Sequence, residues 1–161
     1  MNISPAALIA TIRINLARHP LWPLGIVQES LDVSRQQLMA MVDTGELSWV
    51  WDISTKRLRK ELRVLGHCVV DRQSGPVSGI GATKSLKLPE VLNLILPQVR
   101  PSLRGVEIQR LLACSPDAVR DLHQAGELVR VKETIPSKGI NASPRFTRAS
   151  VAKFLSDRRL V

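Results

Sequence analysis

The sequence predicts a mainly α-helical fold in which one small unit occurs twice in tandem, with minor β content. The first observation is an internal repeat at an offset of 81 positions, about half of the 161 residues. The second is a capped, amphipathic helix pattern in both copies, and the third is an ordinary globular apolar content of 44%. Because two copies are too few for a solenoid, we expect a duplicated domain.

The repeat is clearest between residues 32–47, DVSRQQLMAMVDTGEL, and residues 113–128, ACSPDAVRDLHQAGEL. Identical residues also recur at this offset in the pairs Pro20 and Pro101, Gln28 and Gln109, Leu31 and Leu112, and Ser34 and Ser115. Between the copies the chain is rich in Gly and Ser, which is typical of a linker. We therefore expect a first domain at 1–72, a linker at 73–86 and a second domain at 87–161.

Each domain is expected to open with two helices. The first is predicted at about 5–18 in one copy and at about 88–96 in the other. A shorter helix follows within residues 23–31 and within residues 102–112, and a connection of three or four residues leads from it to a third, capped helix.

This capped helix of the first copy carries signals at both ends. Ser34 is a good N-cap, because its hydroxyl can accept from the free amides of the first turn, and Gln37 completes a capping box. Leu38 and Met41 fall on one apolar face of the helix. Gly45 ends it, since glycine takes the left-handed conformation without steric cost.

The second copy repeats these signals with Ser115 as the cap and Pro116 at the first helical position, where its missing amide costs nothing. Val119 and Leu122 face inward, and Gly126 ends the helix. A helix, a tight turn and a capped second helix together form the helix-turn-helix signature.

The two copies differ after this helix. In the second copy residues 128–135 alternate like a strand, 136–144 form a turn-rich loop, 145–147 a second strand, and 148–159 a helix with Val151, Phe154 and Leu155 on one face. This order predicts a β-hairpin wing followed by a helix. In the first copy the chain leads directly into a predicted helix at 55–65 with inward Leu58, Leu62 and Leu65, so the first wing is about 12 residues shorter, or absent.

Two tryptophans, Trp49 and Trp51, stand two positions apart on a predicted strand and so face one side of it. We expect them to cover the core beneath the short wing. The alternative is an exposed patch that binds a protein partner.

Residues 105–158, which contain VEIQRLLACSPDAVRDLHQAGELVRV and PRFTRASVAKFL, resemble the winged helix-turn-helix of excisionase and MerR-type regulators. The shared pattern is a capped recognition helix, a Gly-x-Leu stop, a hairpin wing and an Arg-containing strand that leads into a helix. Residues 24–65 resemble it more weakly. The resemblance implies sequence-specific binding of double-stranded DNA by a transcriptional regulator or excisionase-like architectural factor of a bacterium, phage or mobile element. Neither half has the long dimerising helix of MerR-type regulators, so we expect a monomer that acts as a pseudo-dimer, or a homodimer.

The charge balance agrees with a polyanionic partner, because 23 Lys and Arg face 14 Asp and Glu, for a net charge of +9. A recognition helix presents its N-terminal outward residues to base edges. In the first copy these residues are Arg35, Gln36 and Gln37; in the second they are Arg120 and His123, beside Asp117 and Asp121, which would repel phosphates. The alternative for Arg35 and Gln36 is a solvated helix start.

Two further basic groups are candidates for phosphate contacts. The segment TKRLRKELR offers Lys56, Arg57, Arg59, Lys60 and Arg63, and the second wing and the start of its last helix offer Lys132, Lys138, Arg145 and Arg148. In a second possible register, STKRLRKELRVLG is itself the recognition helix and HCVVDRQSG begins a wing. The alternative to phosphate binding is a solvated helix face for the first group and an ordinary loop for the second.

An enzyme is not expected, because acidic residues are dispersed and GPVSGIGATKS, at 75–85, lacks the spacing of a phosphate-binding loop. Cys68, Cys114 and the three histidines show no metal-site spacing, so we expect no metal or cofactor and buried thiols in a reducing cytoplasm. No apolar stretch reaches membrane-spanning length. The rival function is a winged-helix adaptor that binds proteins within a nucleoprotein complex.

Overall fold

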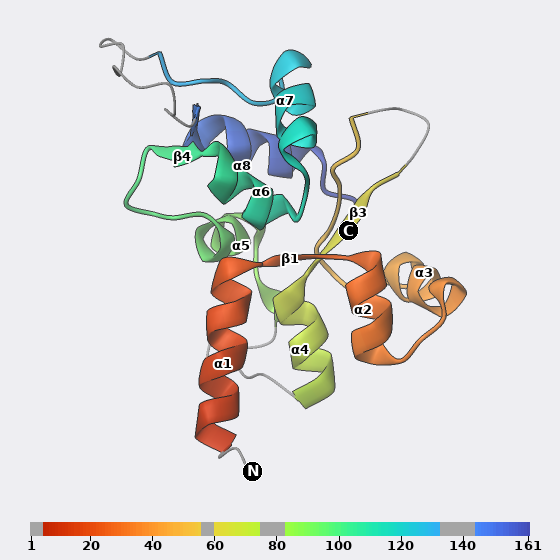
Figure 1. Cartoon of the computed structure of the whole chain (residues 1–161). Helices are drawn as coiled ribbons and strands as arrows, with labels where there is room; N and C mark the ends of the chain where they lie inside the picture. The colour runs from red at the N-terminus through yellow and green to blue at the C-terminus, as the bar shows by residue number, and fades with distance from the viewer. Residues whose placement is uncertain (1–4, 56–59, 75–82, 133–143) are drawn as a thin grey trace.

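The structure is a computed structural model that describes residues 5–55, 60–74, 83–132 and 144–161. In these residues the fold is mainly helical with small antiparallel sheets (Figure 1). The helices are α1 (Pro5–Arg18), α2 (Leu24–Leu31), α3 (Arg35–Asp43), α4 (Gly66–Ser74), α5 (Leu88–Ile95), α6 (Gly105–Leu112), α7 (Pro116–Gln124) and α8 (Arg148–Asp157), with a 3₁₀ turn at Thr83–Ser85. The strands are β1 (Leu21–Pro23), β2 (Val50–Asp52), β3 (Leu62–Leu65), β4 (Ser102–Arg104) and β5 (Arg145–Thr147).

The strands form two antiparallel sheets. In the first, β3 lies between β1 and β2, with Val64 opposite both Trp22 and Val50. In the second, β4 pairs with β5 and places Leu103 opposite Phe146, while Arg130 forms a single bridge to the other side of Phe146. Each sheet therefore has a central strand, β3 or β5, that is paired on both sides.

The order of elements recurs along the chain. A short strand and two helices are followed by β2, β3 and α4 in the first half, and by an isolated bridge at Arg130, β5 and α8 in the second. Of the strand predicted at 128–135 the structure shows only this bridge, and residues 133–135 lie outside the described residues. Backbone hydrogen bonds recur as well: Leu47 N donates to Met41 O at 3.0 Å, and Leu128 N donates to Leu122 O at 3.3 Å, 81 positions later. The predicted helices around both turns are confirmed, as are α1, α5, β5 and α8.

The predicted start of the last helix in the first copy is wrong. Residues Leu62–Leu65 form the central strand β3, every residue of which is buried, and the helix begins only at Gly66. Lys56–Arg59 lie outside the described residues. The spacing of Leu62 and Leu65 fits a helix. A strand that is buried on both faces needs no alternation of apolar and polar residues, so the same spacing is equally compatible with such a strand. The second register fails too, because HCVVDRQS is helix α4 and no wing.

The wings are nearly equal in length. The paired residues Val50 and Val64 are 14 positions apart, and Arg130 and Phe146 are 16 positions apart. The expected difference of about 12 residues is therefore wrong; the structure gives two. The short strands β1 and β4 were also missed, and β4 occupies the first three residues of the helix expected at 102–112.

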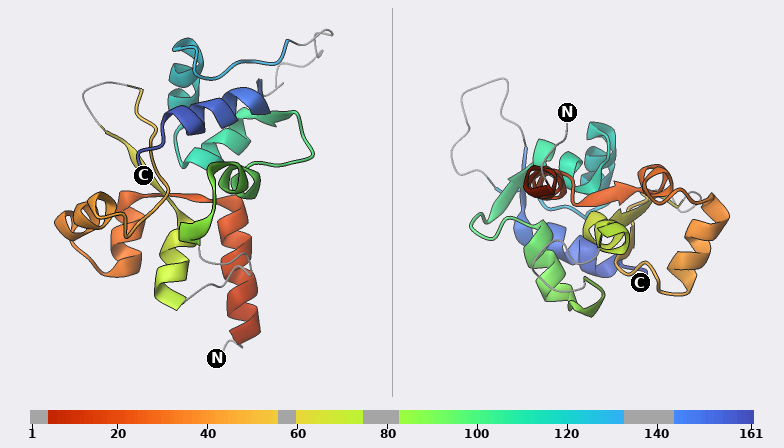
Figure 2. Two further views of the ribbon diagram at one scale, coloured as in Figure 1. Left: turned by 180° about the vertical axis from the view of Figure 1, so that it is seen from behind. Right: turned by 90° about the horizontal axis from the view of Figure 1, so that it is seen from below.

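The two halves share one hydrophobic cluster. Trp49, Trp51 and Leu65 of the first half pack in it with Ile108 and Phe146 of the second. A second cluster lies beneath α2 and α3. This sharing joins the halves into one packed body. Figure 2 shows the arrangement of the helices and strands from two further sides.

Both tryptophans are buried, with relative exposures of 2% for Trp49 and 0% for Trp51. The Trp49 indole donates to Thr83 O at 2.9 Å, and the Trp51 indole donates to Leu155 O at 2.8 Å. The core position is thus confirmed, and a protein-binding patch at these residues is wrong because neither side chain reaches the surface.

The C-terminal residues extend the first sheet. Leu160 N donates to Val50 O at 2.8 Å, Val50 N donates to Val161 O at 3.2 Å, and Arg159 forms a bridge to Trp51. The outer edge of β2 is therefore covered by a segment from the far end of the chain (Figure 1).

The linker expected at 73–86 is described only in part. Helix α4 includes Ser74, and residues 75–82 lie outside the described residues. Thr83 is buried and fixed by Asp71, whose carboxylate accepts from the Thr83 amide at 3.0 Å and from its hydroxyl at 2.7 Å. The final part of this segment therefore belongs to the packed body.

Candidate nucleic-acid interface

The start of α3 projects two unoccupied polar side chains. The Ser34 hydroxyl accepts from Gln37 N at 3.2 Å, and the Gln37 side-chain oxygen accepts from Ser34 N at 2.8 Å, which completes the predicted capping box. Arg35 and Gln36 lie in this first turn, exposed and with no acidic neighbour in the turn. Gln37 is exposed, but its side-chain oxygen is engaged in the cap. Arg35 and Gln36 are thus the residues that α3 offers to a partner.

The start of α7 carries a balanced charge instead. The Ser115 hydroxyl accepts from Ala118 N at 3.2 Å, which confirms the cap. Asp117 and Arg120 are both exposed and form an ion pair along the helix. The positive charge of Arg120 is therefore largely offset where it would meet phosphates.

His123 is structural in this fold. Its Nδ1 lies 2.8 Å from Leu128 O, and its ring meets the Phe146 ring edge to face at a centroid distance of 5.6 Å. The predicted role of His123 in DNA contact is not supported, because the ring is half-buried and occupied by these contacts.

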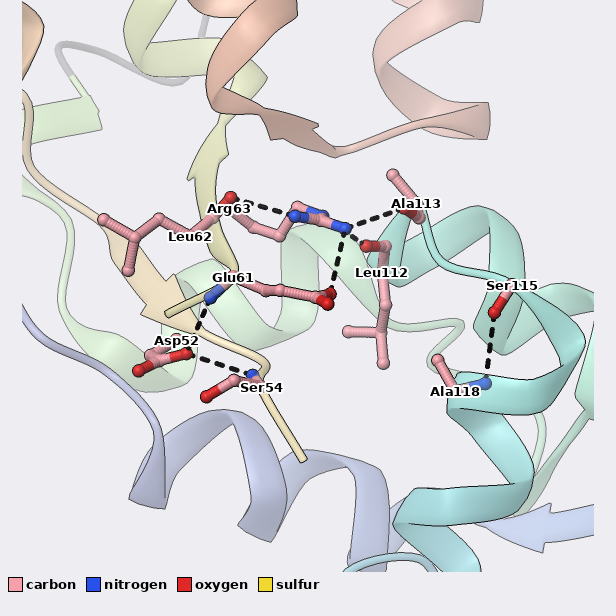
Figure 3. A network of polar contacts seen from close by, with 9 residues as sticks. All are labelled: Asp52, Ser54, Glu61, Leu62, Arg63, Leu112, Ala113, Ser115 and Ala118. Carbon is pink, nitrogen blue, oxygen red and sulfur yellow. Dashed lines mark hydrogen bonds and ion pairs between the residues drawn. The ribbon is translucent and has the colours of Figure 1, made fainter. Parts of the chain in front are cut away.

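Arg63 is buried at 9% exposure, so its predicted phosphate contact is wrong. Its Nε donates to Leu112 O at 2.8 Å and its Nη2 to Ala113 O at 2.9 Å, across the boundary between the halves (Figure 3). Burial lowers the pKa of Arg63, and the Glu61 carboxylate 3.9 Å away opposes that shift. The guanidinium therefore neutralises the negative C-terminal end of α6.

The base of the first hairpin is closed by Asp52. Its carboxylate accepts from Ser54 N at 3.0 Å and from Glu61 N at 3.2 Å (Figure 3). Burial raises the pKa of Asp52, but these hydrogen bonds outweigh burial and hold the pKa below its usual value. Lys60 is exposed beside this closure, while Lys56, Arg57 and Arg59 lie outside the described residues.

The base of the second wing carries several exposed cations. Arg145 on β5 stands directly opposite Arg104 on β4, so both side chains lie on one face of the sheet. Arg130 and Lys132 are exposed on the other arm of the wing, and Lys138 lies outside the described residues. The sequence pattern did not single out Arg104 or Arg130 as candidate phosphate contacts. Arg104 falls within the helix expected at 102–112, and Arg130 is one of several residues of the alternating segment 128–135.

Arg148 contacts the protein itself. Its Nε donates to Pro97 O at 3.0 Å and its Nη2 lies 3.4 Å from the Asn93 side-chain oxygen. These bonds tie the start of α8 to the end of α5, so Arg148 is held away from a phosphate role.

No family model, curated protein or solved structure matches this chain. Among the described residues, no helix is long and apolar enough to cross a membrane. The same residues contain no group of three or more His, Cys, Asp and Glu suited to a metal ion.

Proposed function

We propose that this protein binds double-stranded DNA sequence-specifically through two tandem winged helix-turn-helix units, as a cytoplasmic regulator or excisionase-like architectural factor. The observation that carries the proposal is the capped start of α3, where Arg35 and Gln36 are exposed and the first turn holds no acidic residue. Arginine pairs bidentately with guanine, and glutamine with adenine, in the major groove. The net charge of +9 supplies the general attraction to phosphates.

The second unit has a different part in this proposal. Arg130, Lys132 and Arg145 at the base of its wing grip the backbone, whereas Arg104 is already paired with Glu107. Helix α7, with its Asp117–Arg120 pair, reads bases weakly. Helix α3 packs in the first-half cluster with Val50 and Val64, and their strand neighbours Trp51 and Leu65 belong to the shared cluster. We therefore expect one chain to engage DNA as a unit of fixed geometry and to act as a pseudo-dimer.

The test begins with selection of a preferred site from a random duplex library by the full chain. Arg35→Ala should then weaken binding to the selected site by about 1–3 kcal/mol and relax the preference at one base position. Arg120→Ala, one turn further along α7 and at a residue already paired with Asp117, is the control and should cost less. If the full chain shows no affinity for any duplex even at low salt, the proposal fails.

A protein adaptor is the second candidate, and the Asp117–Arg120 pair on α7 favours it, because a charge-balanced helix face suits a protein surface better than DNA. A mobility-shift assay at low and moderate salt separates the two functions. DNA binding should weaken steeply as salt rises, since counterions released from DNA drive it.

A further inference from the structure

A groove of about 770 Å³ lies between the last turn of α1, the segment that joins α5 to β4, and helix α6. These three elements meet beside β1 and β4 in Figure 1. Neither α3 nor α7 contributes a residue to its lining. The groove is therefore separate from the proposed reading helices.

The lining is largely apolar, with Pro20, Leu94 and Leu111 among its residues. Val99 also lines the groove and is 95% exposed, the most exposed large apolar side chain among the described residues. Val99 therefore adds exposed apolar surface to the apolar lining of the groove, and covering that surface is favourable.

Positively charged residues outnumber negatively charged residues in the lining of the groove. Arg18, Arg100 and Arg110 line it together with a single acid, Glu107. Glu107 accepts from Arg100 Nη1 at 2.8 Å and from Arg104 N at 2.7 Å, so its charge is already used. Burial raises the pKa of Glu107, but the hydrogen bonds and the two arginines outweigh burial and hold the pKa below its usual value, which keeps the carboxylate ionised.

Arg18 and Arg110 are exposed and form no ion pair with the described residues. They stand at two walls of the groove, one on α1 and one on α6. The groove thus offers a net positive rim above an apolar floor. A phosphate backbone would satisfy the rim and leave the floor wet, whereas a peptide with both carboxylates and apolar side chains satisfies both.

We propose that this groove binds a partner protein through an extended segment in which acidic and apolar residues are mixed. The site allows the chain to hold a protein partner while α3 faces DNA. It does not depend on the DNA-binding proposal, because none of its residues belongs to α3, α7 or the wing strand β5.

The test is a selection of randomised peptides, about 12 residues long, displayed on phage and captured by the full chain without DNA. Recovered peptides should combine Asp or Glu with Leu, Ile, Val, Phe or Met. A synthetic peptide from this pool should lose at least about tenfold in affinity with Arg110→Glu and with Arg18→Glu, because one lost charge contact of about 1.4 kcal/mol equals a factor of ten. Arg110→Lys should retain part of the binding.

Lys84→Glu is the matched control, since Lys84 is exposed on the 3₁₀ turn and outside the groove, and it should leave the affinity unchanged. Circular dichroism and melting temperature verify that each variant is folded, and Arg110→Ala replaces Arg110→Glu if the latter unfolds. The proposal is overturned if no peptide is enriched, if the peptides bind the Arg110 variants as tightly as the unaltered protein, or if random duplex DNA binds the groove and displaces them through Arg18 and Arg110.

Discussion

The two halves of the molecule place most of their helices and strands in the same order, but they distribute charge differently. Helix α3 begins with Arg35 and has no acid in its first turn, whereas the first turn of α7 holds Asp117, which is paired to Arg120. In the first half, this helix carries an exposed cation, Arg35. The second half keeps exposed cations at the base of its wing, where Arg145 stands opposite Arg104. A repeated backbone plan therefore does not imply a repeated use.

Equivalent positions also differ in packing. The first residue of α4, Gly66, donates its amide to Pro20 O, and the first residue of α8, Arg148, donates its amide to Pro101 O. At this shared position the first half needs a residue without a side chain, and the second half uses a long side chain that reaches α5. The comparison shows that each half is adapted to its place in a joint core.

The largest expected effect concerns the joint between the halves. Arg63→Met should lower the free energy of unfolding by about 3 kcal/mol, because it leaves the carbonyls of Leu112 and Ala113 without their charged donor. Urea unfolding followed by circular dichroism measures this loss. Lys60→Met, at an exposed position nearby, should stay within about 0.5 kcal/mol of the unaltered protein. Equal stability of the two variants would mean that the halves do not depend on this contact.

The next effect concerns the space above α4. A Cβ on Gly66 would lie 2.6 Å from the Trp22 indole nitrogen and 2.8 Å from a Leu16 methyl, so Gly66→Ala should cost about 2 kcal/mol. The matched control is Gly105→Ala at the start of α6, where the nearest atom is 3.7 Å from the added Cβ. Thermal melting of both variants checks the difference. A Gly66→Ala protein as stable as Gly105→Ala would contradict the tight fit.

A smaller effect depends on pH and is confined to the first half. Burial lowers the pKa of His67, and the negative charge of Asp71 opposes that shift. The Nδ1 atom of His67 is buried and has no hydrogen-bond partner among the described residues. The unfolded chain therefore takes up this proton at a higher pH than the folded protein does, and stability is lost as pH falls through the ordinary histidine pKa near 6.5.

From pH 7 to pH 5.5 we expect this histidine to remove about 1 kcal/mol of stability. Urea midpoints at both pH values should differ less in His67→Gln than in the unaltered protein. An unchanged pH dependence in the variant would show that His67 is not the responsible group.

The smallest expected effect concerns the charge balance at the start of α7. Asp117→Asn removes the partner of Arg120 and should raise affinity for duplex DNA about two- to threefold, since an exposed ion pair contributes roughly 0.2–1 kcal/mol. Asp157→Asn frees Lys153 in the same way on α8 and serves as the control for net charge. Titration of a labelled duplex at fixed salt compares them. Equal gains would assign the effect to overall charge and not to the face of α7.

The helices were predictable because their ends carry local signals. Ser34 with Gln37, Ser115 with Pro116, and the glycines at 45 and 126 mark boundaries that depend only on neighbouring residues. Strands β1 and β4 are only three residues long, and they are extended because they pair with strands that are distant in the sequence. Three residues are too few to show the alternation by which a strand is recognised in a sequence.

The buried position of Arg63 was not predictable for the same reason. In the sequence it belongs to a basic run, and only its pairing in β3 directs it to the end of α6. The exposed Arg35 and Gln36, in contrast, follow from the cap itself. Local contacts thus defined the start of α3, while long-range contacts decided which cations remained on the surface.

The covered edge of β2 has a consequence for synthesis on the ribosome. Trp51 on β2 bridges to Arg159, so more than 100 residues must still be translated after β2 emerges. At about 5–20 residues per second this takes on the order of 5–20 s, during which an unpaired strand edge is open to wrong pairing. We therefore expect the nascent first half to need protection from wrong pairing, by a chaperone or by delayed formation of β2, until residues 158–161 have been synthesised and pair with β2.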